Sequence, residues 1–228
     1  MSIMTTSSAP RSSAEIRAYL KDQLNQALRR PGMYGDEIAL RLLFDHLAYA
    51  EHQDEEFAQA LRTLTSRGAF NGGGVTGAIS TVLPDSSGHG VASIYAELAH
   101  DREWLQADRT LTPDEYADMR RTLVGWAAHD RTFTDVRELF GPPSLLIGGT
   151  NPYFGKTLAY LTSHAAAPIV FFHFWNGSDS QAEKTRPPIY DEPVLLAVRA
   201  GRGAFKDTFT FTPEGDRRRP ARHPATGA

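Results

Sequence analysis

The stretch from Thr134 to Phe211 constrains the fold more than any other part of the chain. A short helix is predicted to end at Gly141, and Pro142-Pro143 then starts an extended segment. Four further apolar runs follow, rich in β-branched or aromatic residues and bounded by Gly, Pro or Asn: KTLAYLT, PIVFFHFW, PVLLAVRA and AFKDTFTF. Runs of this kind are typical of strands joined by turns. We therefore expect a mostly antiparallel sheet of about five strands.

The chain before this stretch is predicted to be helical. Ser12 to Glu15 has the spacing of a capping box, and the apolar residues that follow recur every four positions, which indicates an amphipathic helix. The same reasoning predicts helices near residues 36–47, 55–66, 75–83, 91–105 and 113–127. Because helices precede strands and do not alternate with them, we expect an α+β fold. An N-terminal layer of about five to six helices would pack on a C-terminal, mostly antiparallel sheet of about five strands.

These patterns divide the chain into three parts. Residues 1–12 are polar and lack the apolar core of a signal peptide, so we expect a disordered lead-in. Residues 13–212 are predicted to form a single α+β domain, with a helical part at 13–133 and a helix-plus-sheet part at 134–212. Residues 213–228 carry several arginines without apolar periodicity, which predicts a disordered basic tail.

Composition excludes several classes of function. The 228 residues carry a formal net charge of -3, so no general attraction to nucleic acid or to an anionic membrane is expected. The chain contains no cysteine, which removes disulfides, thiolate nucleophiles and cysteine-based metal sites. Its longest apolar runs are far too short to span a membrane. We expect a cytoplasmic protein with no nucleic-acid or membrane partner, and the oligomeric state stays open.

Two glycine-containing segments resemble phosphate-binding loops in part. The tripeptide Gly155-Lys156-Thr157 lacks the glycine that such a loop needs five positions earlier, where Thr150 stands, and a strand is expected after it where the motif requires a helix. Residues 72–77 (GGGVTG) precede a possible helix and either offer backbone amides to an anion or act as a flexible connector. No strand is predicted before them, which favours the connector. We expect no nucleotide cofactor.

One helix carries a pair with the spacing of a metal motif. Glu97 and His100 stand three residues apart, as in the helices of di-iron proteins. Such a site needs a second Glu-x-x-His pair and further glutamates, and the sequence contains no second pair. We therefore expect no metal, with Glu97 and His100 on a solvated helix face.

The predicted sheet contains the most informative polar residues. Alternation along residues 169–175 places apolar side chains on both sides, so this strand is expected to be central and covered on both faces. Within it His173 is polar in an apolar row, and Arg199 interrupts the next run. If they converge with neighbouring polar groups, a polar-tipped aromatic pocket would be lined by His173, Arg199, Tyr160, Asn151, Tyr153 and Asn176. The alternative is a hydrogen-bonded core histidine and an arginine at the sheet rim.

A second segment carries a family resemblance. Residues 27–47 (ALRRPGMYGDEIALRLLFDHL) resemble the RPGMY segment of gyrase-B-type ATPases, where the same letters also lie between two helices. In that family the next helix carries a Glu and, four residues later, an Asn that holds magnesium. The corresponding helix here offers Asp45 and Tyr49, so no ATP site of that type is expected. We expect the Pro-Gly pair to make a turn, with Met33 and Tyr34 packed into the core.

Two functions from different classes fit these observations. The first is a binding or interaction protein that docks on a protein partner. RPGMY after a first helix and an FGPPS entry to a strand meander resemble small bacterial proteins of immunity type, which bind and neutralise a partner toxin. Trp175, Tyr153 and Phe154 would then be exposed interface anchors.

The alternative is a small-molecule enzyme of biosynthetic tailoring type, with a pocket between sheet and helices. His173 would act as acid or base, Arg199 as an anion clamp, and Tyr153 or Asn151 as orienting groups. A closed cavity of several hundred Å³ that holds both His173 and Arg199 would favour the enzyme. A filled core with an exposed aromatic patch would favour the interaction protein.

Overall fold

A computed structural model of the chain describes residues 12–84, 88–151, 153–164, 166–177 and 188–220. Most of the predicted lead-in, the end of the predicted tail and most of the long polar connection after the third strand lie outside these described residues.

The N-terminal part is helical, as predicted. Its helices are α1 (Ser13–Arg29), α2 (Pro31–Tyr34), α3 (Asp36–Glu51), α4 (Asp54–Arg67), α5 (Gly74–Ile79) and α6 (Gly88–Asp101). The Ser12–Glu15 capping box starts α1, because the serine hydroxyl accepts from the Glu15 amide while the Glu15 carboxylate accepts from the Ser12 amide. Gly35 lies between α2 and α3 in a left-handed backbone conformation. Glycine adopts this conformation without strain, whereas a residue with a side chain does not.

Two further helices precede the sheet. They are α7 (Pro113–Trp126) and α8 (Phe133–Phe140), and each begins with a complete capping box, Thr112 with Glu115 and Thr132 with Asp135. Gly141 ends α8 at the position predicted from the sequence.

The strands form one antiparallel meander, which confirms the expected α+β class and the expected sheet. They are β1 (Leu145–Ile147), β2 (Thr157–Tyr160), β3 (Val170–Trp175), β4 (Val194–Arg199) and β5 (Phe209–Phe211), and they neighbour one another in sequence order. Every residue of β3 is buried, so this strand is central and covered on both faces, as its apolar pattern predicts.

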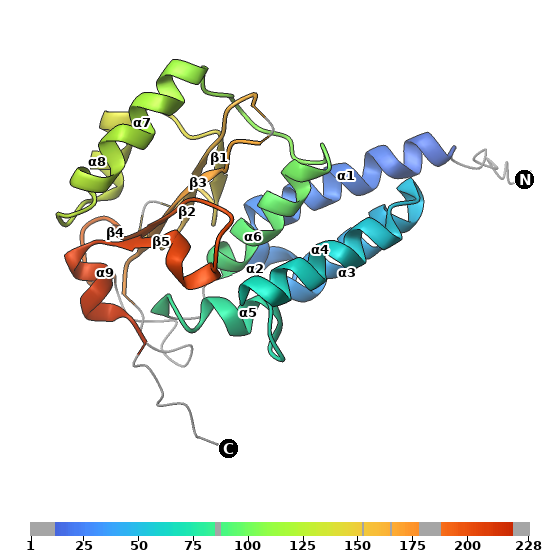
Figure 1. Cartoon of the computed structure of the whole chain (residues 1–228), viewed down its shortest axis with the longest axis horizontal. Helices are drawn as coiled ribbons and strands as arrows, with labels where there is room; N and C mark the ends of the chain where they lie inside the picture. The colour runs from blue at the N-terminus through green and yellow to red at the C-terminus, as the bar shows by residue number, and fades with distance from the viewer. Residues whose placement is uncertain (1–11, 85–87, 152, 165, 178–187, 221–228) are drawn as a thin grey trace, which may run out of the picture.

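Helices cover both faces of the sheet, which gives three layers (Figure 1). On one face, α7 and α8 pack on a cluster that includes Tyr160 and Phe172. On the other face, α1, α3 and α6 pack on a cluster that includes Phe171, Trp175 and Phe209. No helix in the described part of the chain is long and apolar enough to cross a membrane.

The structure differs from the sequence-based prediction at the C-terminal end. Residues Phe205–Thr208 form a 3-10 helix before β5, where a continuous strand was expected. Residues Pro213–Arg218 form α9, where a disordered tail was expected, because Thr212 caps the helix and Arg217 and Arg218 both pair with Glu214.

Candidate functional site

Helix α6 carries a row of polar side chains on a face that is otherwise apolar. His89, Ser93 and Glu97 stand at successive four-residue steps, so they lie on one side of the helix. Hydrogen bonds place this row against the sheet, where Thr157, His173 and Arg199 lie on adjacent strands. A line of polar groups, buried except for the half-buried His89, therefore runs between α6 and strands β2 to β4.

At one end of this line Glu97 and Arg199 form an ion pair. Arg199 Nη1 donates to Glu97 Oε2 at 2.8 Å, and Nη2 donates to the Ser93 carbonyl at 3.3 Å. The central carbon of the guanidinium, Cζ, lies 4.3 Å from the centroid of the Phe171 ring. Both residues are almost fully buried, and Arg199 Nε has no hydrogen-bond partner among the described residues. Glu97 was expected on a solvated face, and that expectation is wrong, because Arg199 reaches it from β4.

At the other end two histidines meet on one hydroxyl. Thr157 Oγ1 lies 2.9 Å from His89 Nδ1 and 3.0 Å from His173 Nδ1. A hydroxyl has one proton to donate, so one imidazole accepts and the other donates, and the two neutral rings are opposite tautomers. Burial and the Lys156 charge lower the pKa of His89 to about 3. Burial, followed by the charges of Arg199 and His89, holds the pKa of His173 well below its usual value.

The core around these groups is filled. The hollow that touches His173 measures about 10 Å³, enough for at most one water, and Arg199 does not line it. His173 and Arg199 do share a face of the sheet, but among the described residues the hollow at His173 is far below substrate size and does not reach Arg199. Among the described residues the arrangement is that of hydrogen-bonded core residues.

The other predicted pocket residues lie elsewhere. Tyr160 projects from the opposite face of the sheet, where its hydroxyl donates to the Gly141 carbonyl at 2.8 Å, so the expected convergence with His173 and Arg199 does not occur. Asn176 is buried at the end of β3 and bonds the Tyr190 backbone in both directions.

The predicted interface anchors divide into two groups. Trp175 is 5% exposed, with the Arg218 guanidinium 3.8 Å from its ring centroid, so it is a core residue and the expectation of an exposed anchor is wrong. Tyr153 and Phe154 are exposed on the β1–β2 loop, beside Asn151, whose side chain accepts from the Tyr153 amide.

The glycine-rich segment at the start of α5 binds an anion from its own chain. The Glu37 carboxylate accepts from the Val75 and Thr76 amides at 2.7 Å each, from the Thr76 hydroxyl at 2.6 Å and from the Tyr95 hydroxyl at 3.1 Å. Burial, followed by the Glu37 charge, raises the pKa of Tyr95. The Val75 and Thr76 amides therefore bind the chain's own Glu37 carboxylate. Gly74, at φ +73°, allows this close approach, because a side chain at that position would collide with the carboxylate.

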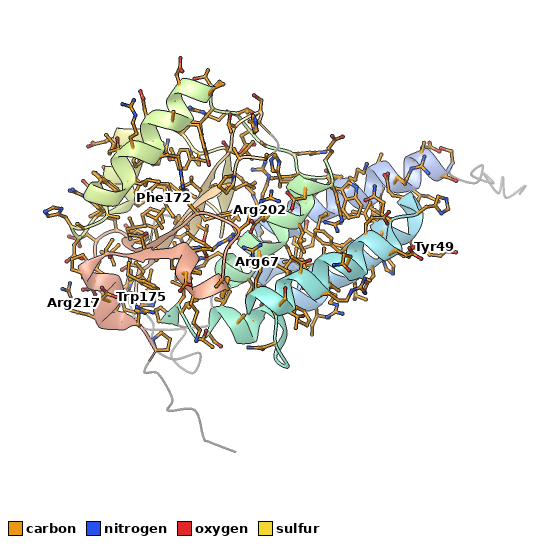
Figure 2. All side chains as sticks on the ribbon, in the orientation of Figure 1. Tyr49, Arg67, Phe172, Trp175, Arg202 and Arg217 are labelled. Carbon is orange, nitrogen blue, oxygen red and sulfur yellow. The ribbon has the colours of Figure 1, made fainter. Side chains whose placement is uncertain are left out.

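An exposed apolar surface lies across α1 and α3. We call it the α1–α3 surface and define it by the exposed side chains of Ile16, Tyr19, Ile38, Leu42 and Tyr49. Tyr49 is 77% and Leu42 52% exposed, and a groove of about 310 Å³ between the helices is lined by Tyr19 and Leu42, among others. Tyr49 lies at the outer edge of the helical layer (Figure 2). Met33 was expected in the core, and that expectation is wrong, because its side chain is exposed on α2, which connects α1 to α3.

Sequence reasoning missed both this surface and the polar row of α6. The four-residue spacing of His89, Ser93 and Glu97 was a usable signal for the row, because such spacing places polar groups on one side of an apolar helix. No comparable signal marks the α1–α3 surface, because exposed and core-facing apolar residues look alike in the sequence. Among the described residues no group of three His, Asp or Glu side chains could hold a metal ion.

Fold and site together define a three-layer α+β protein with a filled polar core and an apolar helical surface. No protein-family model, curated protein or solved structure matches this chain.

Proposed function

We propose that this chain is a protein-binding module and that the α1–α3 surface is where it docks on its partner. The single observation that supports this is the exposure of large apolar side chains on two packed helices, with Tyr49 and Leu42 each more than half exposed. Contiguous exposed apolar side chains mark interaction sites in soluble proteins, and tyrosine is frequent among the residues that dominate binding energy.

The shape of this surface favours a partner that inserts apolar side chains. Ile38, Leu42 and Tyr49 share one side of α3 with the exposed Asp45, because steps of three, four and seven residues return to the same face of a helix. Tyr19 of α1 completes the groove beside Leu42. Such a groove suits an amphipathic helix that presents apolar residues at three- and four-residue spacing.

Charged groups border the surface near the end of α3. Lys21 Nζ lies 2.8 Å from Glu51 Oε1, and the Arg17 guanidinium is 3.9 Å from the same oxygen. A polar rim around an apolar centre is the usual anatomy of a protein interface. The likeness of the RPGMY and FGPPS segments to immunity-type proteins makes a toxin the partner expected here.

The enzyme hypothesis has less support than the binding module. It requires a cavity that holds both His173 and Arg199, and the hollow at His173 admits at most one water.

The test is site-specific photocross-linking in the producing cells. A photoreactive phenylalanine analogue at Leu42 should capture one protein partner, whereas the same analogue at exposed Arg120 of α7, on the opposite side of the sheet, should capture none. Equal capture from both positions, or capture of a second copy of the chain at Leu42, would contradict the proposal. The variant Leu42→Glu should then weaken binding of the captured partner by about tenfold or more, because it places a charge in the apolar centre.

A further inference from the structure

A second hollow lies between α4 and α6 and is distinct from the α1–α3 surface. It measures about 660 Å³, within the usual size of small-molecule sites. Its floor is apolar and consists of Ala60 and Leu64 from α4 and Ile94 and Leu98 from α6. We call it the α4–α6 groove.

An arginine lies at each end of the groove, and Arg102 joins its two walls. Arg67 extends from the end of α4, and its guanidinium donates to the carbonyls of Gly201 and Gly203. Arg102 follows α6, and its guanidinium donates to the Glu56 carbonyl on α4 and to the Leu98 carbonyl. Among the described residues neither arginine forms an ion pair, and Arg102 Nε is buried without a partner.

The charges at the Arg67 end leave one cation unmatched. Arg202 pairs with Asp101 and Arg199 pairs with Glu97. Glu56 and Glu103 also line the groove, near Arg102, and among the described residues Arg67 forms hydrogen bonds to carbonyls but no ion pair. Figure 2 shows Arg67 and Arg202 near one another beside α6. Burial lowers the pKa of Arg67, while the nearby Glu97 and Asp101 carboxylates act in the opposite direction and the Arg199 and Arg202 charges add to the lowering.

We propose that the α4–α6 groove binds an amphiphilic oxyanion, a small molecule with an apolar body and a carboxylate or phosphate head. The head lies on the Arg67 guanidinium, which binds planar and tetrahedral oxyanions through paired N–H donors. The body covers Ala60, Leu64, Ile94 and Leu98 on the floor. This site is independent of the proposed docking of a protein partner.

The test is calorimetric titration of the full chain with decanoate, decyl phosphate and neutral decanol. At least one of the two anions should bind more tightly than decanol, and the tighter of them identifies the head group. The variant Arg67→Gln should weaken that anion by about tenfold or more and leave decanol unchanged, because one charge-assisted contact is lost. The matched control is Arg62→Gln, an exposed arginine of α4 outside the groove, which should bind like the parent chain.

Two further variants locate the site. Ala60→Phe should abolish binding of the anion by filling the floor, while Leu42→Glu should leave it unchanged and so separate this site from the α1–α3 surface. Circular dichroism melting of each variant checks that the fold is kept. The proposal fails if neither anion binds better than decanol, if folded Arg67→Gln binds the anion like the parent chain, or if Leu42→Glu abolishes binding.

Discussion

Glu97 Oε2 accepts a 2.8 Å hydrogen bond from Arg199 Nη1 across the boundary between α6 and β4. The two residues stand 102 positions apart in the sequence, and both are almost fully buried. A buried pair of this kind gains little over an apolar pair of similar volume, but loss of one partner leaves a charge without compensation in the core. The pair therefore makes the docking of α6 on the sheet sensitive to single substitutions.

Replacement of Glu97 should destabilise the fold strongly. Glu97→Gln is expected to lower the free energy of unfolding by about 3 kcal/mol, because the Arg199 guanidinium stays buried without its counter-charge. Urea denaturation followed by circular dichroism measures the change. The matched control is Asp101→Asn, which removes the partner of Arg202 at the surface and should cost less than about 1 kcal/mol. Equal losses of unfolding free energy in the two variants would contradict the expected difference between the buried pair and the surface pair.

Stability should fall as the pH drops below about 6.5, where histidines of an unfolded chain bind protons. The folded-state pKa of His89 is about 3 and that of His173 is well below its usual value, because both rings are buried near Lys156 or Arg199. Below pH about 6.5 the unfolded chain therefore binds more protons than the folded chain. The free energy of unfolding should fall by up to about 1.4 kcal/mol per pH unit for each histidine, with no loss above pH about 6.5.

Urea denaturation at pH 7.5, 6 and 5 measures this slope. The variant His89→Gln should reduce it, since one of the two buried bases is removed, while His46→Gln, an exposed histidine of α3, should leave it unchanged. A flat profile between pH 7.5 and 5 would contradict the buried, neutral state of the pair.

Trp175 should behave as a core residue. Trp175→Ala is expected to lower the free energy of unfolding by about 3–5 kcal/mol, because the residue is only 5% exposed and its ring contacts Arg218 and Tyr190. Tyr153→Ala, which truncates an exposed aromatic residue, should change it by less than about 0.5 kcal/mol. Thermal melts of the two variants give the comparison, and a shift as small for Trp175→Ala as for Tyr153→Ala would place the indole at the surface.

Glu37 should stabilise the first turn of α5. Glu37→Gln replaces one carboxylate oxygen with an amide donor that faces the donors of Val75, Thr76 and Tyr95, so the expected loss is about 1–3 kcal/mol. Hydrogen exchange of the Val75 and Thr76 amides should accelerate in the same variant. The exposed Glu55→Gln on α4 is the control, and unchanged exchange in Glu37→Gln would argue against the carboxylate as their acceptor.

The predictable part of the fold comes from local signals. Thr112 and Glu115 mark the start of α7, Gly141 ends α8, and alternation in residues 170–175 identifies a central strand. Local signals did not predict α9, which Thr212 caps in a segment without apolar periodicity. This helix is held by hydrogen-bonded ion pairs of Arg217 and Arg218 with Glu214, and such pairs leave no apolar pattern in the sequence.

The sequence by itself therefore determined the helices before the sheet and the antiparallel sheet, though not the 3-10 helix or α9, because caps, turns and periodicity act between residues close in the chain. The tertiary structure alone decided that Glu97 meets Arg199, that His89 and His173 share the Thr157 hydroxyl, and that Trp175 is buried while Tyr49 is exposed. These relationships depend on how helices pack on the sheet. That packing joins residues far apart in the sequence, where no local pattern records which side chains will meet.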